Sequence, residues 1–335
     1  MKNITKSLLA VLAFAGITAT GHAADYQNHI IRFGYGLAED SNQGRAAKFL
    51  ADDLSKRTGG KLKMKGFASA SLGNDIQMQN ALIGGAQEMT VVSTATLVGI
   101  VSDFGVYDLP FVFRNEREAD AILDGPFGQN LNARLEEKGL VALAYWENGF
   151  RNLTNSKRPI TKMEDLQGIK LRVMQNPIYI DMFKGFGANA IPLAFSELFT
   201  ALETRTVDGQ ENPITTIQSS KLYEVQKYLS LTKHVYSPWI VLVSKKWWDG
   251  LNADEKKALK ESAAASRDFE RKDSREASVK GLEFLKQKGM QVTVISDKEL
   301  ERMQDTTRQA MNKFAADGHV KLVKDLQSDL EKLRK

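Results

Sequence analysis

Arg172 is the residue of this chain whose chemistry most needs an explanation. It lies in a strand-like segment, residues 169–174 (IKLRVM), in which Leu171 and Val173 face one side and Arg172 faces the other. An arginine in an apolar strand is costly unless a partner completes it, and its planar fork matches a carboxylate through two parallel hydrogen bonds. Arg172 is therefore a candidate carboxylate ligand, although an edge position or an internal salt bridge would also explain it.

A second group of arginine and aromatic residues occurs in residues 144–158 (AYWENGFRNLTNSKR). Trp146 and Arg151 flank Asn148 and Gly149, a dipeptide that favours tight turns. We therefore expect a turn at Asn148 and Gly149. Trp146 and Arg151 would then lie near the strand ends on either side of it.

The sequence offers no convincing set of catalytic or metal-binding residues. It contains no cysteine, and no two of its four histidines are four residues apart. The motifs GxxxxGK[ST], GxSxG and HExxH are all missing. After Gly34-Tyr35-Gly36, the acids Glu39 and Asp40 would repel a pyrophosphate, which excludes a dinucleotide-binding loop. We therefore expect a protein that is not an enzyme and has neither a cofactor nor a metal ion.

Length and composition indicate a globular protein of about two domains. The chain has 335 residues, of which 42% are apolar and 26% charged, and its formal net charge is +5. Because this charge is mild and its basic and acidic residues are interspersed, nucleic acid is not an expected partner.

The first 23 residues have the pattern of a secretory signal peptide. Lys2 and Lys6 precede ten apolar residues, 8–17, and Gly21-His22-Ala23 is typical of a cleavage site. Ten apolar residues are too few to cross a membrane as a helix, which takes about 20. We therefore expect export, and a chain without cysteine fits a bacterial periplasm best.

The candidate residues need a scaffold, and the apolar patterns predict alternating strands and helices. This order favours an α/β sheet with crossover helices. Strands are expected at residues 30–35, 62–67, 89–92, 140–146, 169–174, 238–244 and 291–295. Helices are expected from Ser41 and after Asn115, and at residues 75–83, 178–186, 196–204, 217–229, 253–289 and from 297 onward.

Several motifs extend along nearly the whole mature chain. Residues 171–234 contain LRV, AFSE, VDGQENP and YEVQKYL, and outside them occur SxxLGxD at 69–75, GFRNLTNSKRPI, and SKKWWDGL at 244–251. In this combination the chain resembles the periplasmic solute-binding proteins of tripartite ATP-independent periplasmic (TRAP) transporters, the DctP family.

The resemblance implies a periplasmic-binding-protein-like clam shell of two α/β domains, joined by crossover strands and a long connecting helix. Domain I would comprise residues 24–148 plus 238–276, and domain II residues 149–237 plus 277–335. In this family the domains close on an organic acid, and small and large membrane subunits import that acid with sodium. We expect the same partners here, with a monomeric binding protein in the periplasm.

The resemblance also assigns roles to single residues. Arg172 becomes the principal carboxylate clamp and Arg151 the second arginine of the cleft. Asn212 would be a polar ligand contact, Phe195 an aromatic wall, and Gln77 a polar contact from the opposite domain.

Three further residues complete the expected site. Trp239 and Tyr236 lie in the returning crossover and would stack on, or hydrogen-bond to, a sugar-like ligand. Gln175 adds another amide to the expected cleft.

The composition of this site favours a sugar acid, either a hexuronate or an aldonate. Keto-acid binders of the family carry Glu-Trp where this chain has Glu211-Asn212, so a sodium–keto-acid site is not expected. A four-carbon dicarboxylate is the alternative, since two arginines could clamp two carboxylates. A secreted enzyme acting on sugar acids and a binding partner of a sensor are further alternatives.

Overall fold

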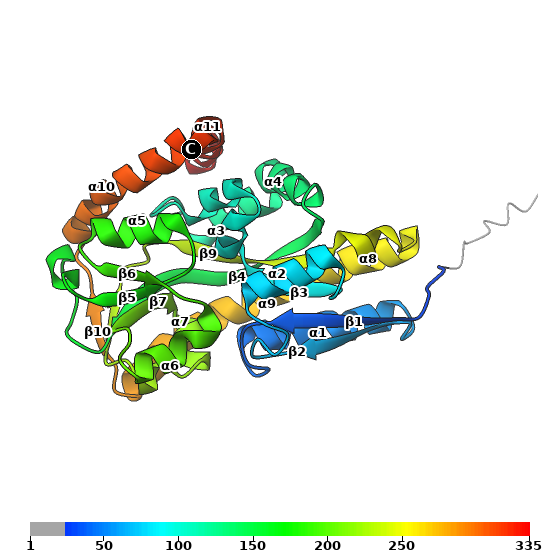
Figure 1. The fold of residues 1–335 in the computed structure, drawn as a ribbon, viewed down its shortest axis with the longest axis horizontal. Coiled ribbons are helices and arrows are strands. Elements are labelled where there is room, and N and C mark those ends of the chain that lie inside the picture. Colours follow the sequence, from blue (N-terminus) through cyan, green and yellow to red (C-terminus); the bar gives the residue numbers. More distant parts are fainter. Residues whose placement is uncertain (1–23) are drawn as a thin grey trace, which may run out of the picture.

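The computed structural model describes residues 24–335, in which ten strands form one continuous sheet (Figure 1). The predicted signal peptide, residues 1–23, lies outside the described residues. Along the sheet the strands are β2 (Leu62–Phe67), β1 (His29–Tyr35), β3 (Met89–Ser93), β9 (Tyr236–Ser244), β4 (Leu140–Asn155), β7 (Gly209–Pro213), β5 (Lys170–Val173) and β6 (Asn189–Pro192). Strand β8 (Tyr228–Leu231) also pairs with β4, and β10 (Gln291–Val294) pairs with β8.

The first lobe is built on β1, β2, β3, β9 and the first part of β4. Its β9 is buried along its whole length because the sheet is covered on both faces. Ile240 and Leu242 pack into one apolar core, and Val241 and Val243 into the other. The helical segments of this lobe are α1 (Asn42–Arg57), α2 (Asp75–Gly84), η1 (Thr94–Gly99), η2 (Ser102–Asp108), α3 (Glu116–Asp124), α4 (Pro126–Glu136) and α8 (Lys245–Asp249).

The second lobe is built on β5, β6, β7, β8, β10 and the last part of β4. Its helical segments are η3 (Met163–Leu166), α5 (Pro177–Gly185), η4 (Phe195–Glu197), α6 (Leu198–Glu203), α7 (Ile214–Ser219), η5 (Leu222–Glu224) and α10 (Asp297–Phe314). The helix predicted over residues 217–229 is wrong. Helix α7 ends at Ser219, Lys221 adopts a left-handed conformation with φ of 54°, and the chain then enters β8.

Strand β4 joins the lobes, and the turn predicted at Asn148 and Gly149 is wrong. The strand continues through both residues and pairs first with β9 and then with β7. The dipeptide instead occupies a bulge, in which Gly149 adopts a φ of 111° that suits glycine. Because β9 continues to pair across the bulge, the expected crossover strands are confirmed.

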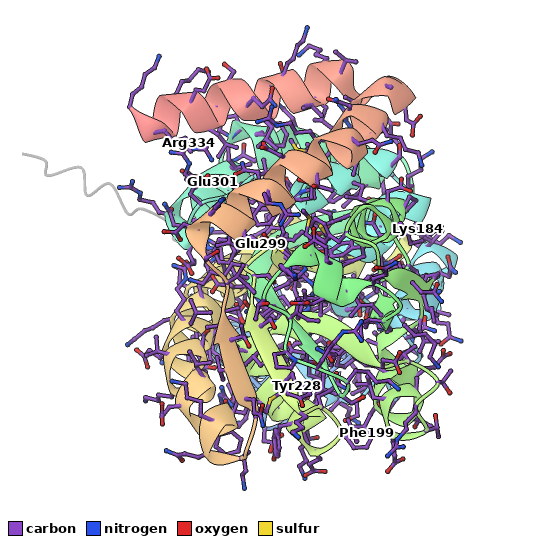
Figure 2. The ribbon with its side chains drawn as sticks, turned by 90° about the vertical axis from the view of Figure 1, so that its left-hand side faces the viewer. Lys184, Phe199, Tyr228, Glu299, Glu301 and Arg334 are labelled. Atoms are coloured by element: carbon purple, nitrogen blue, oxygen red, sulfur yellow. The ribbon has the colours of Figure 1, made fainter. Side chains whose placement is uncertain are left out.

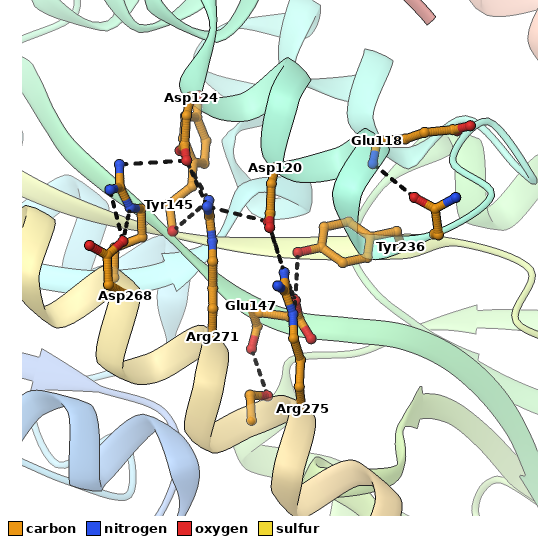
Figure 3. A network of polar contacts seen from close by, with 12 residues as sticks. Glu118, Asp120, Asp124, Tyr145, Glu147, Tyr236, Asp268, Arg271 and Arg275 are labelled. Atoms are coloured by element: carbon orange, nitrogen blue, oxygen red, sulfur yellow. Dashed lines mark hydrogen bonds and ion pairs between the residues drawn. The ribbon is translucent and has the colours of Figure 1, made fainter. Parts of the chain in front are cut away.

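Helix α9 (Ala253–Gln287), 35 residues long, is the expected long connecting helix. It packs against α1 and β4 of the first lobe and α7 of the second. Figure 3 shows how its arginines reach α3 and β4. Arg271 pairs with Asp124 at 2.6 Å, while Arg275 pairs with Asp120 at 2.8 Å and with Glu147 at 2.7 Å. These pairs attach the helix to the first lobe just where β4 begins to cross.

The C-terminal helices connect the lobes a second time (Figures 1 and 2). Helix α10 packs against α5, and α11 (Val320–Arg334) packs against α3, with a kinked turn, Ala315–His319, between them. Arg334 forms an ion pair with Glu118 on α3 at 2.8 Å. Helix α11 therefore lies against the first lobe, whereas the predicted boundaries place it in domain II.

Glu270 of α9 is a buried carboxyl group that lies between α1 and the crossing strand. Its Oε2 accepts a hydrogen bond from the Glu147 backbone N–H at 2.6 Å, and its Oε1 accepts one from Asn42 Nδ2 at 3.3 Å. Asn42 Oδ1 is buried and has no hydrogen-bond partner among residues 24–335. Burial, together with the nearby Glu147 charge, raises the pKa of Glu270 well above its ordinary value.

Replacing Glu270 by glutamine is therefore expected to flatten the pH dependence of stability. Because the folded-state pKa is raised, the carboxyl stabilises the fold fully below its ordinary pKa and loses this contribution as pH rises toward the folded pKa. The slope for one group is about 1.4 kcal/mol per pH unit. Glu270→Gln should thus unfold at an equal or higher temperature than the parent at about pH 8, and lose this advantage near about pH 4. Thermal unfolding across this range measures the difference, with the exposed Glu276→Gln on the same helix as control. A pH-independent difference would contradict the expectation.

Candidate functional site

A cavity between the two lobes, here called the inner cavity, brings together most of the predicted site residues. Its walls come from both lobes and from the crossing strands. The first lobe contributes Gly36, Leu37, Gln43, Asn74, Asp75, Ser93 and Thr96, the crossing strands Asn148, Arg151 and Trp239, and the second lobe Arg172, Met174, Gln175, Leu193, Ala194, Phe195, Asn212 and Thr216. A molecule held here would contact both lobes at once, so its binding would favour the closed arrangement.

Arg172 reaches this cavity because β5 alternates as predicted. Leu171 and Val173 enter the core of the second lobe, and Arg172 lies on the opposite side. Its Nε donates to the Leu193 carbonyl at 2.9 Å, whereas its buried Nη1 has no hydrogen-bond partner within the described part of the chain. Burial lowers the pKa of Arg172 to about 10. The guanidinium is thus a buried cation whose pairing is incomplete.

Arg151 also borders the cavity, but its charge is already matched. Its Nε and Nη2 donate to the two carboxylate oxygens of Glu211, the second contact at 2.7 Å, and Nη2 also reaches Asn212 Oδ1 at 3.2 Å. Burial disfavours the charged form of each group, but attraction to its charged partner and the hydrogen bonds between them are stronger than this effect. The pKa of Arg151 is therefore raised and that of Glu211 is lowered. His234 Nε2 lies 3.1 Å from the same Glu211 carboxylate. Arg151 therefore has a buried Nη1 without a partner among residues 24–335, but adds little net positive charge.

The structure places four other predicted residues on the cavity wall. Asn212 accepts from Arg151 and donates to Gln210 Oε1, so its amide is held by the buried network. Phe195 packs against apolar residues of both lobes, and Trp239 lies opposite Ser93 in the pairing of β9 with β3. Gln175 is exposed although it lines the cavity, so it lies where the cavity meets solvent.

Two predicted residues lie outside the wall of this cavity. Gln77 exchanges hydrogen bonds with Asn74 in a capping box at the start of α2, which holds its amide at the helix end. Tyr236 is buried against Phe113 and Phe150, and its hydroxyl donates to Glu147 Oε2 at 3.2 Å. Both side chains thus have structural partners.

Asp75 is the important wall residue that the sequence analysis missed. It occupies the first turn of α2, and its Oδ2 accepts from the Ser93 backbone N–H at 3.0 Å. Burial raises its pKa to about 6, although the Ser93 hydrogen bond and the Arg172 charge act in the opposite direction. An acid after SLGN was visible in the sequence, but an acid at a helix start is ordinarily explained by capping. The cavity therefore contains an acceptor carboxylate as well as the Arg172 cation.

Asn148 is a second missed wall residue, hidden by the predicted turn. Its Oδ1 accepts from Thr216 Oγ1 on α7 at 3.0 Å, and both residues line the cavity. This bond connects the crossing strand with the second lobe directly at the site.

Neither a metal cluster nor a membrane-spanning helix occurs in the described range. Residues 24–335 contain no group of three or more His, Asp or Glu side chains placed to hold a metal ion. None of the helices in the same range is long and apolar enough to cross a membrane.

Comparison with known proteins identifies the family of this fold. A family model for "Bacterial extracellular solute-binding protein, family 7", the DctP family, matches residues 33–317. The chain belongs to the DctP family. The resemblance seen in the motifs and the two-domain α/β fold that it implied are both confirmed.

Relatives of this DctP-family chain cover nearly its whole length. The 2,3-diketo-L-gulonate-binding periplasmic protein YiaO of Escherichia coli (strain K12) is 40% identical over 293 residues, covering 88% of this chain and 89% of YiaO. The sugar acid binding protein DctPAm of Advenella mimigardefordensis strain DPN7T, solved in complex with galactonate, has a TM-score of 0.90 and 49% identity, covering 92% of this chain and 99% of that one. A TRAP periplasmic solute-binding protein of Polaromonas sp. JS666, bound to D-erythronate, has a TM-score of 0.86 and 39% identity, covering 90% and 98%.

Proposed function

We propose that this protein is the periplasmic solute-binding component of a TRAP transporter and that it captures a sugar acid, a hexuronate or an aldonate. It would deliver this acid, as a monomer and without chemical change, to small and large membrane subunits for sodium-coupled uptake. The observation that carries the proposal is the buried guanidinium of Arg172, on the wall of an inter-lobe cavity, whose Nη1 has no partner among residues 24–335. A ligand carboxylate would satisfy the guanidinium by accepting two parallel hydrogen bonds from it. The ligands named for the three relatives all carry one carboxylate and several oxygens.

The charges of the cavity favour a sugar acid over the alternative, a four-carbon dicarboxylate. Two arginines suggested two carboxylate clamps, but Glu211 already matches Arg151. Asp75 adds a carboxylate that would repel a second acid group and accept hydrogen bonds from hydroxyls. One unmatched cation, one acceptor carboxylate and several amides suit a molecule with one acid group and many hydroxyls.

A ligand screen tests the proposal directly. Binding to the folded state alone raises stability by RT ln(1 + [L]/Kd), which is about 2.7 kcal/mol at one hundred times Kd. Protein stripped of ligand by unfolding and refolding should show this rise in unfolding temperature with galactonate, gluconate or galacturonate, and a smaller one with succinate. Mass spectrometry of the recovered ligand should show no turnover. If no uronate, aldonate or dicarboxylate gives heat in calorimetry, the assignment of an organic acid is wrong.

Asp75→Asn is expected to lower the affinity for sugar acids and to leave unchanged or raise the affinity for dicarboxylates. Losing a charged acceptor for hydroxyls costs about 1.5–3 kcal/mol, which is about ten- to 150-fold in affinity for galactonate. Succinate should instead bind equally well or more tightly, because the repelling carboxylate is gone. Calorimetry with both ligands measures the two changes, with the exposed Asp52→Asn as control.

The pKa of Asp75 also predicts how this preference depends on pH. As pH rises through about 6, Asp75 ionises in the parent protein, so the parent should lose succinate affinity relative to Asp75→Asn. Succinate itself also titrates in this pH range. The ratio of its affinity for the parent to its affinity for Asp75→Asn, taken at each pH, cancels that effect. A ratio that does not change with pH would show that Asp75 does not face the ligand.

A further inference from the structure

A second cavity, here called the outer cavity, lies beside the inner one and has no role in the function proposed so far. Its volume is about 590 Å³, and its walls come from α2, η1 and η2 of the first lobe, the start of α5 in the second lobe, and the end of α10 with the kinked turn that follows it. It therefore lies between the lobes, as the inner cavity does, and is large enough for a sugar unit.

The two cavities share part of their walls. Thr96 of the first lobe and Gln175 of the second line both of them. Gln175 is exposed, so its flexible side chain lies at the boundary where the inner cavity meets solvent. A group attached to a ligand in the inner cavity would pass this boundary directly into the outer cavity.

Gln79, on the wall of the outer cavity, has a buried hydrogen-bond acceptor that receives no donor from the described residues. The residue is 1% exposed and lines the outer cavity. Its Nε2 donates to Thr96 Oγ1 at 2.6 Å, and the Thr96 hydroxyl in turn donates to the Ser93 carbonyl at 2.8 Å. Gln79 Oε1 has no hydrogen-bond partner anywhere in residues 24–335. Because an unpaired buried acceptor is costly, this atom points to a ligand that offers a donor such as a hydroxyl.

The rest of the wall suits the apolar face of a neutral sugar ring. Ile76, Ile178 and Phe314 supply apolar surface, and the Phe314 ring is held in place by stacking on His319, with the ring centroids 4.2 Å apart. The Lys313 ammonium on this wall pairs with Asp181 at 2.7 Å, so its charge is already matched. The wall therefore provides acceptor and apolar groups but no unmatched buried cation like Arg172, and a second acid group is not favoured there.

We propose that the binding site extends into the outer cavity and accepts sugar acids that carry a second, neutral sugar unit, the disaccharide aldonic acids. This inference rests on the proposed function, since the acid end occupies the inner cavity against Arg172. The glycosyl unit lies between the lobes in the outer cavity and donates a hydroxyl to Gln79 Oε1. Gln175 turns aside to let the glycosidic link pass.

Gly99 is a position on the wall of the outer cavity where a larger side chain can be tested. A Cβ added at Gly99 meets no atom within 4 Å, and the residue lines the outer cavity but not the inner one. Gly99→Phe should therefore block the second sugar unit only. Gly84→Phe is the matched control, because a Cβ there also meets nothing within 4 Å and Gly84 lines neither cavity. Gln79→Leu removes the unpaired acceptor and is a second, independent variant.

Calorimetry on the full mature chain with gluconate, lactobionate and cellobionate tests the inference. All three acids should bind the parent, and Gly99→Phe should weaken the two disaccharide acids by about tenfold or more while leaving gluconate unchanged. Gln79→Leu should do the same to a smaller extent, and Gly84→Phe should change nothing. If gluconate binds but neither disaccharide acid does, the outer cavity is not a subsite and the proposed function still holds. If the disaccharide acids bind equally well to the parent and to both outer-cavity variants, they bind elsewhere and the inference is wrong. If no acid binds at all, the proposed function and the inference both fail.

Discussion

Arg172→Ala should weaken the binding of a sugar acid by about thirty-fold to several-thousand-fold. This range corresponds to the roughly 2–5 kcal/mol lost when one member of a buried, hydrogen-bonded charge pair is truncated. Arg172→Lys keeps a positive charge but not the two-pronged fork, so its affinity should fall between those of the parent and Arg172→Ala. Titration calorimetry with galactonate measures all three, with Arg32→Ala, a half-exposed strand arginine paired with Glu88, as the control.

The ligand-free stability of Arg172→Ala separates a ligand clamp from a structural arginine. Burial lowers the pKa of Arg172 to about 10, so Arg172 stays charged at neutral pH, but its charge is less favourable in the folded than in the unfolded protein. Without ligand, the alanine variant should therefore be no less stable than the parent. A folded Arg172→Ala that binds within about threefold of the parent would show that Arg172 is not the clamp, and Arg151 would become the leading candidate.

Glu211→Gln is expected to cause the largest loss of stability of any single change considered. It keeps the shape of the side chain but leaves the Arg151 guanidinium buried without its carboxylate. Breaking a buried ion pair by removing one partner costs about 3–5 kcal/mol. Urea unfolding of the ligand-free protein measures the loss. A change below about 1 kcal/mol would mean that Arg151 finds other acceptors in the folded state.

A double variant isolates the cost of the uncompensated charge. Much of the cost of breaking a buried ion pair comes from the charge that is left uncompensated, and removing both charges removes that cost. Arg151→Met combined with Glu211→Gln should therefore recover much of the stability lost by Glu211→Gln alone. If the two changes simply add, the loss comes from the hydrogen bonds of Glu211 to its other neighbours, such as His234, rather than from its pairing with Arg151.

The sequence was sufficient to predict the family, the fold class and most of the strands. Arg172 was found because strand alternation is a local property: Leu171 and Val173 on one face place it on the other. Strand β9 was found because its apolar run is continuous, as expected for a strand covered on both faces.

What local patterns could not predict were the effects of distant partners. Asn148-Gly149 has the local preference of a turn, but pairing with β9 and β7 carries the strand straight through it. Arg151 was predicted as the second arginine of the cleft, yet Glu211, 60 residues away, matches its charge. The expected helix over 217–229 failed because Lys221 interrupts it and pairing with β4 and β10 draws its last residues into β8. Each difference depends on a contact that no sequence window contains.

The place of β9 in the sheet has a consequence for how this protein is made. The strand lies between β3 and β4, but the chain reaches it only after it has completed the strands β5 to β8 of the other lobe. Until residues 236–244 emerge during synthesis, the first lobe lacks its central strand, and neither lobe is a contiguous fragment that could be expressed alone. Contacts that close such long loops form slowly. A nascent chain of this topology would complete the first lobe only late in its synthesis, and neither lobe could be isolated by a single truncation.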